Sequence, residues 1–177
     1  IKYTDKDGFK LYGNEQGSGI CDDRVLHVLE DIQGVIWATT DYGIARFDQS
    51  IGDFVCLKDS FDGTGVRLIL QEPNGQIWVI PKDGGAYLYD RNTLESTPVS
   101  PFVDGGVNDA PMRITDGIID DQGVIWFSVK QLGLVRVTPN WNSFEHFVKD
   151  SDGDLLVPQG NVLFVRALNK DELLYGG

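Results

Sequence analysis

The stretch that decides the fold of this chain lies at residues 29–37 and reads LEDIQGVIW. It recurs as LQEPNGQIW at residues 70–78 and as IDDQGVIW at residues 119–126. A degenerate fourth copy, NKDELLYGG, occupies residues 169–177 and has Leu174 in the position of the tryptophan. The tryptophans of the first three copies are 41 and 48 residues apart, and Leu174 follows 48 residues later. Self-similarity at this period indicates a repeat architecture, in which each copy is one structural unit.

Each copy is predicted to consist of short strands joined by tight turns. In the first copy, apolar and β-branched runs cover residues 25–29, 35–39, 44–47 and 53–57. Runs of this length leave no room for a helix of about ten residues or more, so the chain is predicted to be all-β. Glycine follows polar residues at the first turn of each copy, where a hairpin needs the positive φ that glycine adopts without steric strain. These turn glycines are Gly34, Gly75 and Gly123.

Four antiparallel strands that repeat every 40 to 50 residues are typical of the blades of a β-propeller. The whole chain, 1–177, is predicted to be one propeller segment. Its parts are the trailing strand of a preceding blade at 1–19, three blades at 20–60, 61–105 and 106–156, and the leading half of the next blade at 157–177. A tryptophan on the second strand of each blade would pack between neighbouring sheets, where burial of its indole contributes roughly 2–3 kcal/mol. These tryptophans are Trp37, Trp78 and Trp126.

The two ends of the chain leave two arrangements open. Either the first strand completes the last half-blade and closes a four-bladed ring, or the chain is a segment of a larger propeller. A stop in the middle of a hairpin would leave an unpaired strand edge, which natural domains avoid. We therefore expect a segment of a longer protein.

The charge balance excludes some classes of partner. The chain has 27 Asp and Glu against 15 Lys and Arg, a formal net charge of −12 at pH 7. Nucleic-acid binding is not expected, because the chain has no excess of cations to release counterions from a phosphate backbone. Small neutral or cationic ligands suit an acidic surface better. No apolar run approaches the ~18 residues of a membrane-spanning helix, so no membrane contact is expected from this segment.

The chain has two cysteines, Cys21 and Cys56. They would bridge in an oxidising compartment, but two cysteines do not make the framework of a disulfide-rich domain. Two separate buried thiols are the favoured interpretation.

No catalytic centre is recognisable in the sequence. The two histidines, His27 and His146, fall within predicted strands. No glycine-rich phosphate loop and no Ser/His/Asp or Cys/His motif is present. The spaced carboxylates of residues 150–154, DSDGD, suit a calcium ion but do not follow the EF-hand pattern, so a solvated turn is the favoured interpretation. Neither a metal nor a cofactor is expected.

A ligand site is predicted from the geometry of a propeller. Propellers commonly bind at the loops that join second to third strands and that link successive blades, because side chains from every blade converge there. The candidates in these loops are Arg24, Asp41, Tyr42, Lys82, Asp83, Arg113, Lys130 and Gln131. Tyr42 offers an aromatic platform beside carboxylate and guanidinium groups, a combination that suits a sugar.

The repeat resembles a known family pattern. Residues 25–48 read V-x-x-V-L-E-D-x-x-G-x-I-W-x-x-T-x-x-G-I-x-R-F-D, which is similar to the two-component regulator propeller repeat. The third copy repeats the pattern at residues 120–126 and 133–136, whereas the second departs from it at residues 72–73 and 86–88.

The resemblance implies a function. Propellers of this family form the periplasmic sensor region of hybrid two-component systems, typically in carbohydrate-foraging gut bacteria. There, two seven-bladed propellers usually precede an immunoglobulin-like domain, a membrane helix, a histidine kinase and a response regulator. The resemblance thus implies a segment of a seven-bladed propeller that binds oligosaccharide, within a homodimeric protein whose kinase lies outside this chain.

Two other functions stay open at this point. The blades of an interaction scaffold would bind protein, or mediate dimerisation, without binding sugar. The streptogramin lyases are propeller enzymes with a similar acidic-x-Gly-x-x-Trp core, and they need a histidine base and a magnesium site on one face. Because neither histidine is predicted to lie in a loop, we expect this segment not to be an enzyme.

Overall fold

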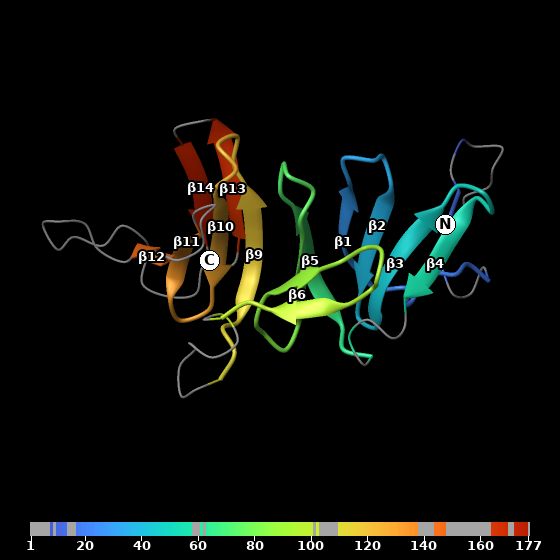
Figure 1. Cartoon of the computed structure of the whole chain (residues 1–177), viewed down its shortest axis with the longest axis horizontal. Helices are drawn as coiled ribbons and strands as arrows, with labels where there is room; N and C mark the ends of the chain where they lie inside the picture. Colours follow the sequence, from blue (N-terminus) through green and yellow to red (C-terminus); the bar gives the residue numbers. More distant parts are fainter. Residues whose placement is uncertain are drawn as a thin grey trace, which may run out of the picture. The chain divides into compact units, whose positions relative to one another are not determined.

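All regular structure in the described part of the chain is β-strand (Figure 1). The computed structural model describes residues 8, 10–13, 17–57, 61, 63–100, 102, 110–137, 144–147, 164–169 and 172–176. It divides the chain into two compact units, Ile1–Val66 and Arg67–Gly177, which we describe separately. Among the described residues, no helix has the length and apolar character needed to cross a membrane. The prediction of an all-β chain is confirmed.

The first unit contains one antiparallel sheet in the order β1-β2-β3-β4. Its strands are β1 (Val25–Glu30), β2 (Ile36–Thr40), β3 (Gly43–Asp48) and β4 (Asp53–Leu57). The register pairs Trp37 with Leu29 on one side and with Arg46 on the other. Because each strand pairs with the one that follows it in sequence, the sheet is a meander, as in a propeller blade.

The second unit repeats this meander. One sheet comprises β5 (Val66–Gln71), which begins at the boundary of the two units, β6 (Ile77–Pro81), β7 (Tyr87–Tyr89) and β8 (Ser96–Pro98). The next comprises β9 (Ile114–Ile119), β10 (Ile125–Val129), β11 (Gly133–Val137) and β12 (Phe144–Phe147), and a two-stranded sheet comprises β13 (Phe164–Asn169) and β14 (Glu172–Gly176). Trp126 pairs with Ile118 and Arg136 at the positions that correspond to Leu29 and Arg46 beside Trp37, although the β10–β11 turn is one residue longer than the β2–β3 turn. Successive meanders in one register are the blades of a β-propeller, so the predicted fold class is confirmed.

A carboxylate six residues before the tryptophan ties together the first hairpin of the blade. Oδ2 of Asp31 accepts a hydrogen bond from the indole Nε1 of Trp37 at 2.7 Å. Oδ1 of Asp31 accepts from the backbone N–H groups of Gln33 and Val35. Asp120 makes the same three kinds of hydrogen bond in the β9–β10 hairpin. Burial of the Asp31 carboxylate, which is 4% exposed, is tolerated because all these donors face it.

In the second blade, two side chains together accept hydrogen bonds of the kinds that a single aspartate accepts in the first and third blades. Glu72 is one methylene longer than aspartate, and its Oε1 accepts a hydrogen bond from the indole of Trp78 at 2.6 Å. Asn74 donates from Nδ2 to Oε2 of Glu72 and accepts from the backbone N–H of Gln76. The departure of this copy from the repeat therefore preserves the hydrogen bond to the indole.

The turns of these hairpins share one backbone pattern. Gly34, Gly75 and Gly123 have φ angles of 76°, 93° and 76°. The N–H of each glycine donates to the carbonyl oxygen of the acidic residue three positions earlier, at 2.8 to 3.0 Å. Glycine suits this position because other residues rarely adopt a positive φ.

Aromatic rings fill the space between the two four-stranded blades of the second unit. The indole of Trp78, on β6, lies 6.0 Å from the ring of Phe127, on β10, between centroids. Phe102, which follows β8, makes edge-to-face contacts with both rings. All three side chains are fully buried. Such pairs contribute about 0.5–1.5 kcal/mol each beyond burial, so this cluster fixes one blade against the next.

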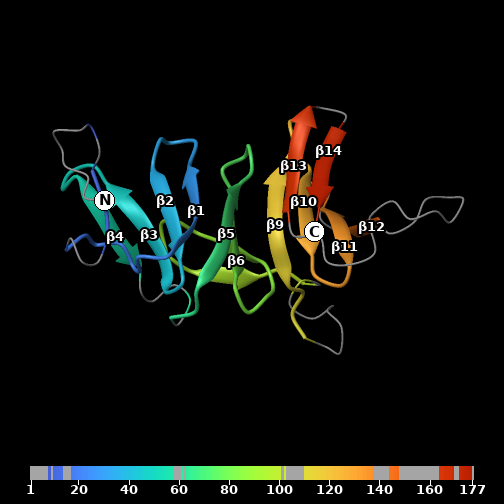
Figure 2. The same ribbon diagram turned by 180° about the vertical axis from the view of Figure 1, so that it is seen from behind.

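The first strands of the last two sheets lie side by side, as Figures 1 and 2 show for β9 and β13. The backbone N–H of Val165, on β13, donates to Oδ2 of Asp116, on β9, at 3.3 Å. Trp126 packs against the apolar cluster that Val165 forms with Leu134. The indole of the third blade therefore contacts the sheet that follows.

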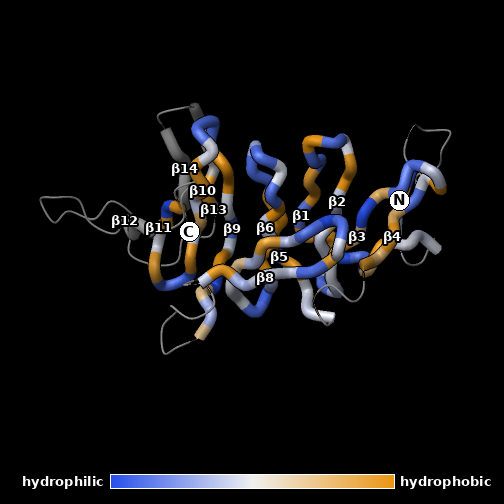
Figure 3. The backbone as a smooth tube through the Cα atoms, viewed as in Figure 1, coloured by the Kyte–Doolittle hydropathy of each residue, from blue (hydrophilic) through white to orange (hydrophobic). Residues whose placement is uncertain are grey.

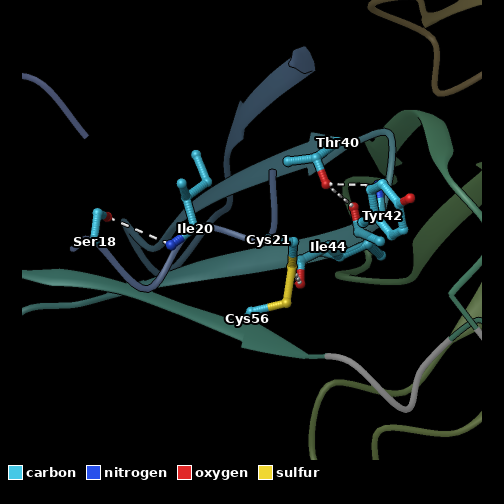
Figure 4. Close-up of a disulfide and its surroundings, with 8 residues drawn as sticks. Ser18, Ile20, Cys21, Thr40, Tyr42, Ile44 and Cys56 are labelled. Atoms are coloured by element: carbon cyan, nitrogen blue, oxygen red, sulfur yellow. Dashed lines mark hydrogen bonds between the residues drawn. A yellow bond between two sulfur atoms is a disulfide. The ribbon is translucent and has the colours of Figure 1, made fainter. Parts of the chain in front are cut away.

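A segment before β1 is tied to the first sheet by a disulfide. Cys21 and Cys56 are joined, with their Cα atoms 4.9 Å apart (Figure 4). The prediction of two separate thiols was therefore wrong. The physical reason is that Gly19 pairs with Val55 of β4 in a parallel bridge, which brings the segment beside the strand that carries Cys56. The sequence separation of 35 residues hides this proximity.

The same segment extends the core of the first unit. The ring of Tyr12 makes edge-to-face contacts with Phe47 and Phe54, at centroid distances of 5.8 and 5.3 Å. Oγ of Ser18 donates a hydrogen bond to Oδ1 of Asp53 at 2.6 Å. This hydrogen bond is the largest of the effects that hold the pKa of Asp53 below its usual value.

Hydropathy follows the strands and turns of the second unit (Figure 3). The strands of the β5–β6 and β9–β10 hairpins are hydrophobic, and the turns that join them are hydrophilic. The buried core of this unit draws its side chains from those strands. The turns and links are thus the part of each blade that is available for a ligand.

Candidate functional site

The predicted ligand-binding residues lie at one end of their sheets. The turn from the second strand to the third and the link into the first strand meet there, because neighbouring strands run in opposite directions. We call this the link end of a blade, and the opposite end the hairpin end. The first unit contributes Arg24, Asp41 and Tyr42. The second unit contributes Lys82, Asp83, Arg113, Lys130 and Gln131.

Arg24 and Asp41 form an ion pair in the first unit. The backbone N–H of Asp41 donates to the carbonyl oxygen of Arg24 at 3.3 Å, and Nη1 of Arg24 lies 3.1 Å from Oδ2 of Asp41. The two side chains are 71% and 20% exposed, so this pair contributes only ~0–1 kcal/mol to stability. Tyr42 follows directly and is 63% exposed. The link end of this blade therefore presents an accessible ring beside an ion pair.

The third blade has the same backbone framework with different charges. The backbone N–H of Lys130 donates to the carbonyl oxygen of Arg113 at 2.8 Å, as Asp41 does to Arg24. Both cationic side chains are exposed. Within the described part of the chain, neither makes an ion pair or a side-chain hydrogen bond. Two cations therefore stand where the first unit has a cation and an anion.

A small pocket opens beside these two cations. Its volume is about 80 Å³, and it is lined by residues 110–113 and 130–132. Gln131 in its wall has a φ of 69°, in the left-handed region that residues other than glycine rarely adopt. Strained backbone of this kind clusters at functional sites, which makes the pocket a candidate for one.

Lys82 and Asp83 lie in the β6–β7 turn, against the link that lines the pocket. The N–H of Gly85 donates to the carbonyl oxygen of Met112 at 2.8 Å. A Cβ atom on Gly84 would lie 3.0 Å from the same oxygen, so the turn and the link pack without room for a side chain. The structure thus brings the predicted residues of the second unit to one region. Those that line the pocket itself are Arg113, Lys130 and Gln131.

A second hollow, at the hairpin end of the second blade, was not predicted from the sequence. It has a volume of about 260 Å³ and is lined by residues 74–77 and 89–92. Oδ1 of Asp90 accepts hydrogen bonds from the backbone N–H groups of Asn92 and Thr93, which hold the pKa of Asp90 below its usual value. These are the bonds of an Asx turn, which the Asp and Asn of this stretch signal in the sequence. The carboxylate of Asp90 is therefore engaged by its own turn.

The histidines lie in strands, as the sequence predicts. His27 is in β1, and His146 is in β12 opposite Val135. Among the described residues, no three His, Cys, Asp or Glu side chains gather in a way that would hold a metal ion. The carboxylates at residues 150–154 lie outside the described residues.

Solved structures with the same fold have different functions. The chain is similar to the extracellular domain of BT4673 from B. thetaiotaomicron, described both as a one-component and as a hybrid two-component system, with a TM-score of 0.70 and 16% identity over 90% of this chain and 21% of that one. It is similar to virginiamycin B lyase from Staphylococcus aureus, with a TM-score of 0.65 and 15% identity over 88% of this chain and 50% of that one. It is also similar to YCF48 bound to D1 peptide, with a TM-score of 0.62 and 12% identity over 85% of this chain and 47% of that one.

These likenesses establish the fold. No protein-family model and no curated protein matches the chain. The chain spans about a fifth of the length of the BT4673 domain. Because one fold serves a regulator, a lyase and a peptide-binding protein, the function has to be argued from the site.

Proposed function

We propose that the chain is a propeller segment of the periplasmic sensor region of a hybrid two-component regulator. Its loops at the link end bind an oligosaccharide, and the bound state is signalled to a histidine kinase outside this chain. The observation that carries the proposal is the likeness of its blades to the extracellular domain of BT4673, over 90% of the chain. The resemblance of its repeat to the regulator propeller pattern points the same way.

The disulfide supports a location outside the cytoplasm. Disulfides persist in oxidising compartments such as the periplasm and are rare in the cytosol, where thiols are kept reduced. Cys21 and Cys56 are joined in the first unit, and the described part of the chain contains no free cysteine. A disulfide of this kind suits the extracytoplasmic part of a membrane-anchored sensor.

The chemistry of the link end supports a saccharide ligand. The exposed ring of Tyr42 can stack on the apolar face of a sugar ring, and Arg24 and Asp41 beside it can bond to hydroxyl groups. In the second unit, Arg113 and Lys130 offer hydrogen-bond donors at the link end of their own blade. The proposal assigns ligand binding to this segment and the enzymatic step to the histidine kinase outside this chain.

The signalling step follows from ligand binding. A ligand shifts the equilibrium between two arrangements of a homodimeric sensor only if it binds one of them more tightly. The link-end loops therefore have to contact the ligand differently in the two states of the full-length protein.

Isothermal titration calorimetry with a panel of oligosaccharides tests the proposal on the full chain. We expect binding that Tyr42→Ala weakens about tenfold or more. Ile51→Ala is the matched control, because Ile51 is also 63% exposed and also lies in a turn of the first sheet, but at its hairpin end. An absence of binding across the panel, or an equal loss in both variants, would refute the proposed site.

A scaffold that binds protein is the second candidate. The likeness to YCF48, a propeller bound to a peptide, favours it. Cross-linking of the full-length protein in its native membrane discriminates the two: a stoichiometric protein partner without saccharide binding supports the scaffold. A lyase is the third candidate and requires a metal-dependent ring-opening activity, which an assay with a streptogramin and magnesium measures.

A further inference from the structure

We infer that Arg113 and Lys130 bind an oxyanion substituent, a carboxylate or a sulfate ester, of an acidic saccharide. The inference rests on the proposed saccharide-binding function and names the chemical class of its ligand. It is carried by a comparison of two blades of the same chain, which hold different charges on the same framework.

The two blades place the relevant residues at equivalent positions. In the first blade, the pair Val25 and Thr40 ends the β1–β2 ladder, and Arg24 and Asp41 lie next to it. In the third blade, Ile114 and Val129 end the β9–β10 ladder in the same way. Arg113 and Lys130 lie next to that pair. A backbone hydrogen bond joins each pair. In the first blade the side chains at these positions meet at 3.1 Å. The framework therefore allows the side chains of Arg113 and Lys130 to converge on one group between them.

The positive charges of Arg113 and Lys130 favour an anionic ligand. Arg24 has the carboxylate of Asp41 as its partner, whereas the residue of the third blade that is equivalent to Asp41 is a second cation, Lys130. Two like charges about 4 Å apart repel by about 1 kcal/mol even in water. An oxyanion between them converts this repulsion into two attractions. The planar guanidinium also matches the two oxygens of a carboxylate or sulfate.

The pocket fits a substituent and not a whole ligand. Its volume of about 80 Å³ is well below the roughly 300–1,000 Å³ of pockets that enclose a small molecule. On this measure one water molecule needs about 10–15 Å³, so the pocket has room for an oxyanion group together with a few waters. Pro111, Met112 and Leu132 line it beside the cations, and these apolar neighbours strengthen a charged hydrogen bond by keeping water away. The sugar ring would then lie outside the pocket.

The hollow at the hairpin end of the second blade has one cation, Arg91, next to a carboxylate in its lining, and not two cations. Its carboxylate, Asp90, already accepts two backbone hydrogen bonds, and an anionic ligand would be repelled by it. The link end of the third blade is therefore the better site for an anion.

Calorimetry and NMR on the full chain test the inference with four probes. The probes are digalacturonate, galactose 6-sulfate, the neutral disaccharide galactobiose and inorganic sulfate. We expect at least one acidic saccharide to bind tenfold or more tightly than galactobiose and to shift the side-chain resonances of Arg113 and Lys130. The preference should shrink as salt is added, because exposed charges are screened. The two acidic probes distinguish a carboxylate from a sulfate ester.

Two variants locate the site. Lys130→Asp puts a carboxylate at the position of the third blade that is equivalent to Asp41 of the first. We expect this variant to lose the preference for acidic probes. Arg91→Ala is the matched control, because it removes a cation that lines the other hollow, at the hairpin end of the second blade, and we expect it to retain the preference. Circular dichroism checks that both variants keep their strand content.

The outcomes separate the inference from the proposed function. Equal affinity for acidic and neutral probes, or an acidic preference that survives Lys130→Asp, would overturn the inference and leave the proposed function standing. If inorganic sulfate shifts Arg113 and Lys130 but no saccharide binds, the anion site is supported, and both its saccharide assignment and the proposed function are refuted. Binding of none of the four probes would refute the site.

Discussion

Replacement of Asp31 by alanine tests whether the carboxylate beneath each hairpin is a structural requirement of the blade. Asp31 accepts three hydrogen bonds, from the indole of Trp37 and from the backbone N–H groups of Gln33 and Val35. Alanine has no acceptor at this position. All three donors lose their partner in the variant.

The expected loss of stability follows from which donors can find water. The side chain of Trp37 is 0% exposed, so its indole N–H stays unsatisfied, which costs about 1–3 kcal/mol. The turn residues are partly or fully exposed, so water can replace the two backbone bonds at a cost of about 0.5–1 kcal/mol each. We therefore expect Asp31→Ala to lower the free energy of unfolding by about 3 kcal/mol. Asp31→Asn keeps one acceptor oxygen, so its free energy of unfolding should lie between those of Asp31→Ala and the native chain.

Urea denaturation followed by far-UV circular dichroism measures this effect. Glu30→Ala is the matched control, because the adjacent Glu30 is an exposed acidic residue, and it should change stability by no more than about 0.5 kcal/mol. A double-mutant cycle with Trp37→Phe isolates the indole bond. We expect a coupling energy of at least about 1 kcal/mol between the two sites.

Two results would refute the reasoning. A coupling energy below about 0.5 kcal/mol would mean that the carboxylate does not act through the indole. An Asp31→Ala variant as stable as Glu30→Ala would mean that the hydrogen bonds of the turn do not hold the hairpin.

Three further predictions concern contacts within the first unit and within the second unit. Cys56→Ser is expected to lower the free energy of unfolding by about 2–4 kcal/mol, because the disulfide closes a long loop; equal stability of the native chain with and without reductant would contradict this. Ser18→Ala should raise the pKa of Asp53 toward 3.8, as carboxyl NMR would show, because the Ser18 hydroxyl is the main cause that lowers it. The folded-state pKa lies below the unfolded value, so the stabilisation is present above pH 3.8 and is lost as the pH falls through the folded pKa; an unchanged pKa in the variant would count against the hydrogen bond. Gly117→Ala would put a Cβ atom 2.6 Å from Cδ1 of Phe127 and should destabilise the chain by about 1–3 kcal/mol in a thermal melt, and an unchanged melting temperature would show that the ring moves freely.

The blade could be predicted from the sequence because its determinants are local. The tryptophan, the turn glycine and the strand lengths all lie within one repeat, and their period is visible in a single chain. The role of the acidic residue was harder to predict, since an Asp in a turn is usually a solvated side chain. Only the buried position of the indole N–H shows that Asp31 has to be an acceptor.

The disulfide could not be predicted because its cause is not local. Cys21 precedes the first strand, and Cys56 lies on the fourth. Their proximity depends on the path of the segment along β4, which no periodic pattern encodes. The bridge closes a loop of this length at a gain of roughly 4 kcal/mol in the chain-entropy model, a large contribution to the first unit that no repeat pattern predicts.

The candidate site was predicted as a set of loops, and the structure refines it to two pairs. Sequence position alone placed the candidates in turns between second and third strands and in links between blades, and the backbone hydrogen bonds of the structure pair Arg24 with Asp41 and Arg113 with Lys130. Which residues form an ion pair and which border a pocket depends on side-chain geometry, which the sequence does not contain. The two cations of the third blade stand at the positions where the same backbone hydrogen bond joins a cation and an anion in the first blade.

The fourth copy of the repeat bears on whether the carboxylate and the indole act as one unit. In the register of β13 and β14, Leu174 pairs with Arg166, as Trp126 pairs with Ile118, so Leu174 stands in the tryptophan position. The residue six positions earlier, where the other copies have Asp or Glu, is Leu168. An acid without its indole would leave a carboxylate short of a donor in a buried turn, and an indole without its acid would leave a buried N–H without an acceptor. Loss of either alone is therefore costly, whereas loss of both leaves apolar side chains that need no partner. The fourth copy thus lacks both the acid and the indole, and its β13–β14 turn is tighter, since Asn169 pairs with Glu172 where Ile119 pairs with Ile125 in the third.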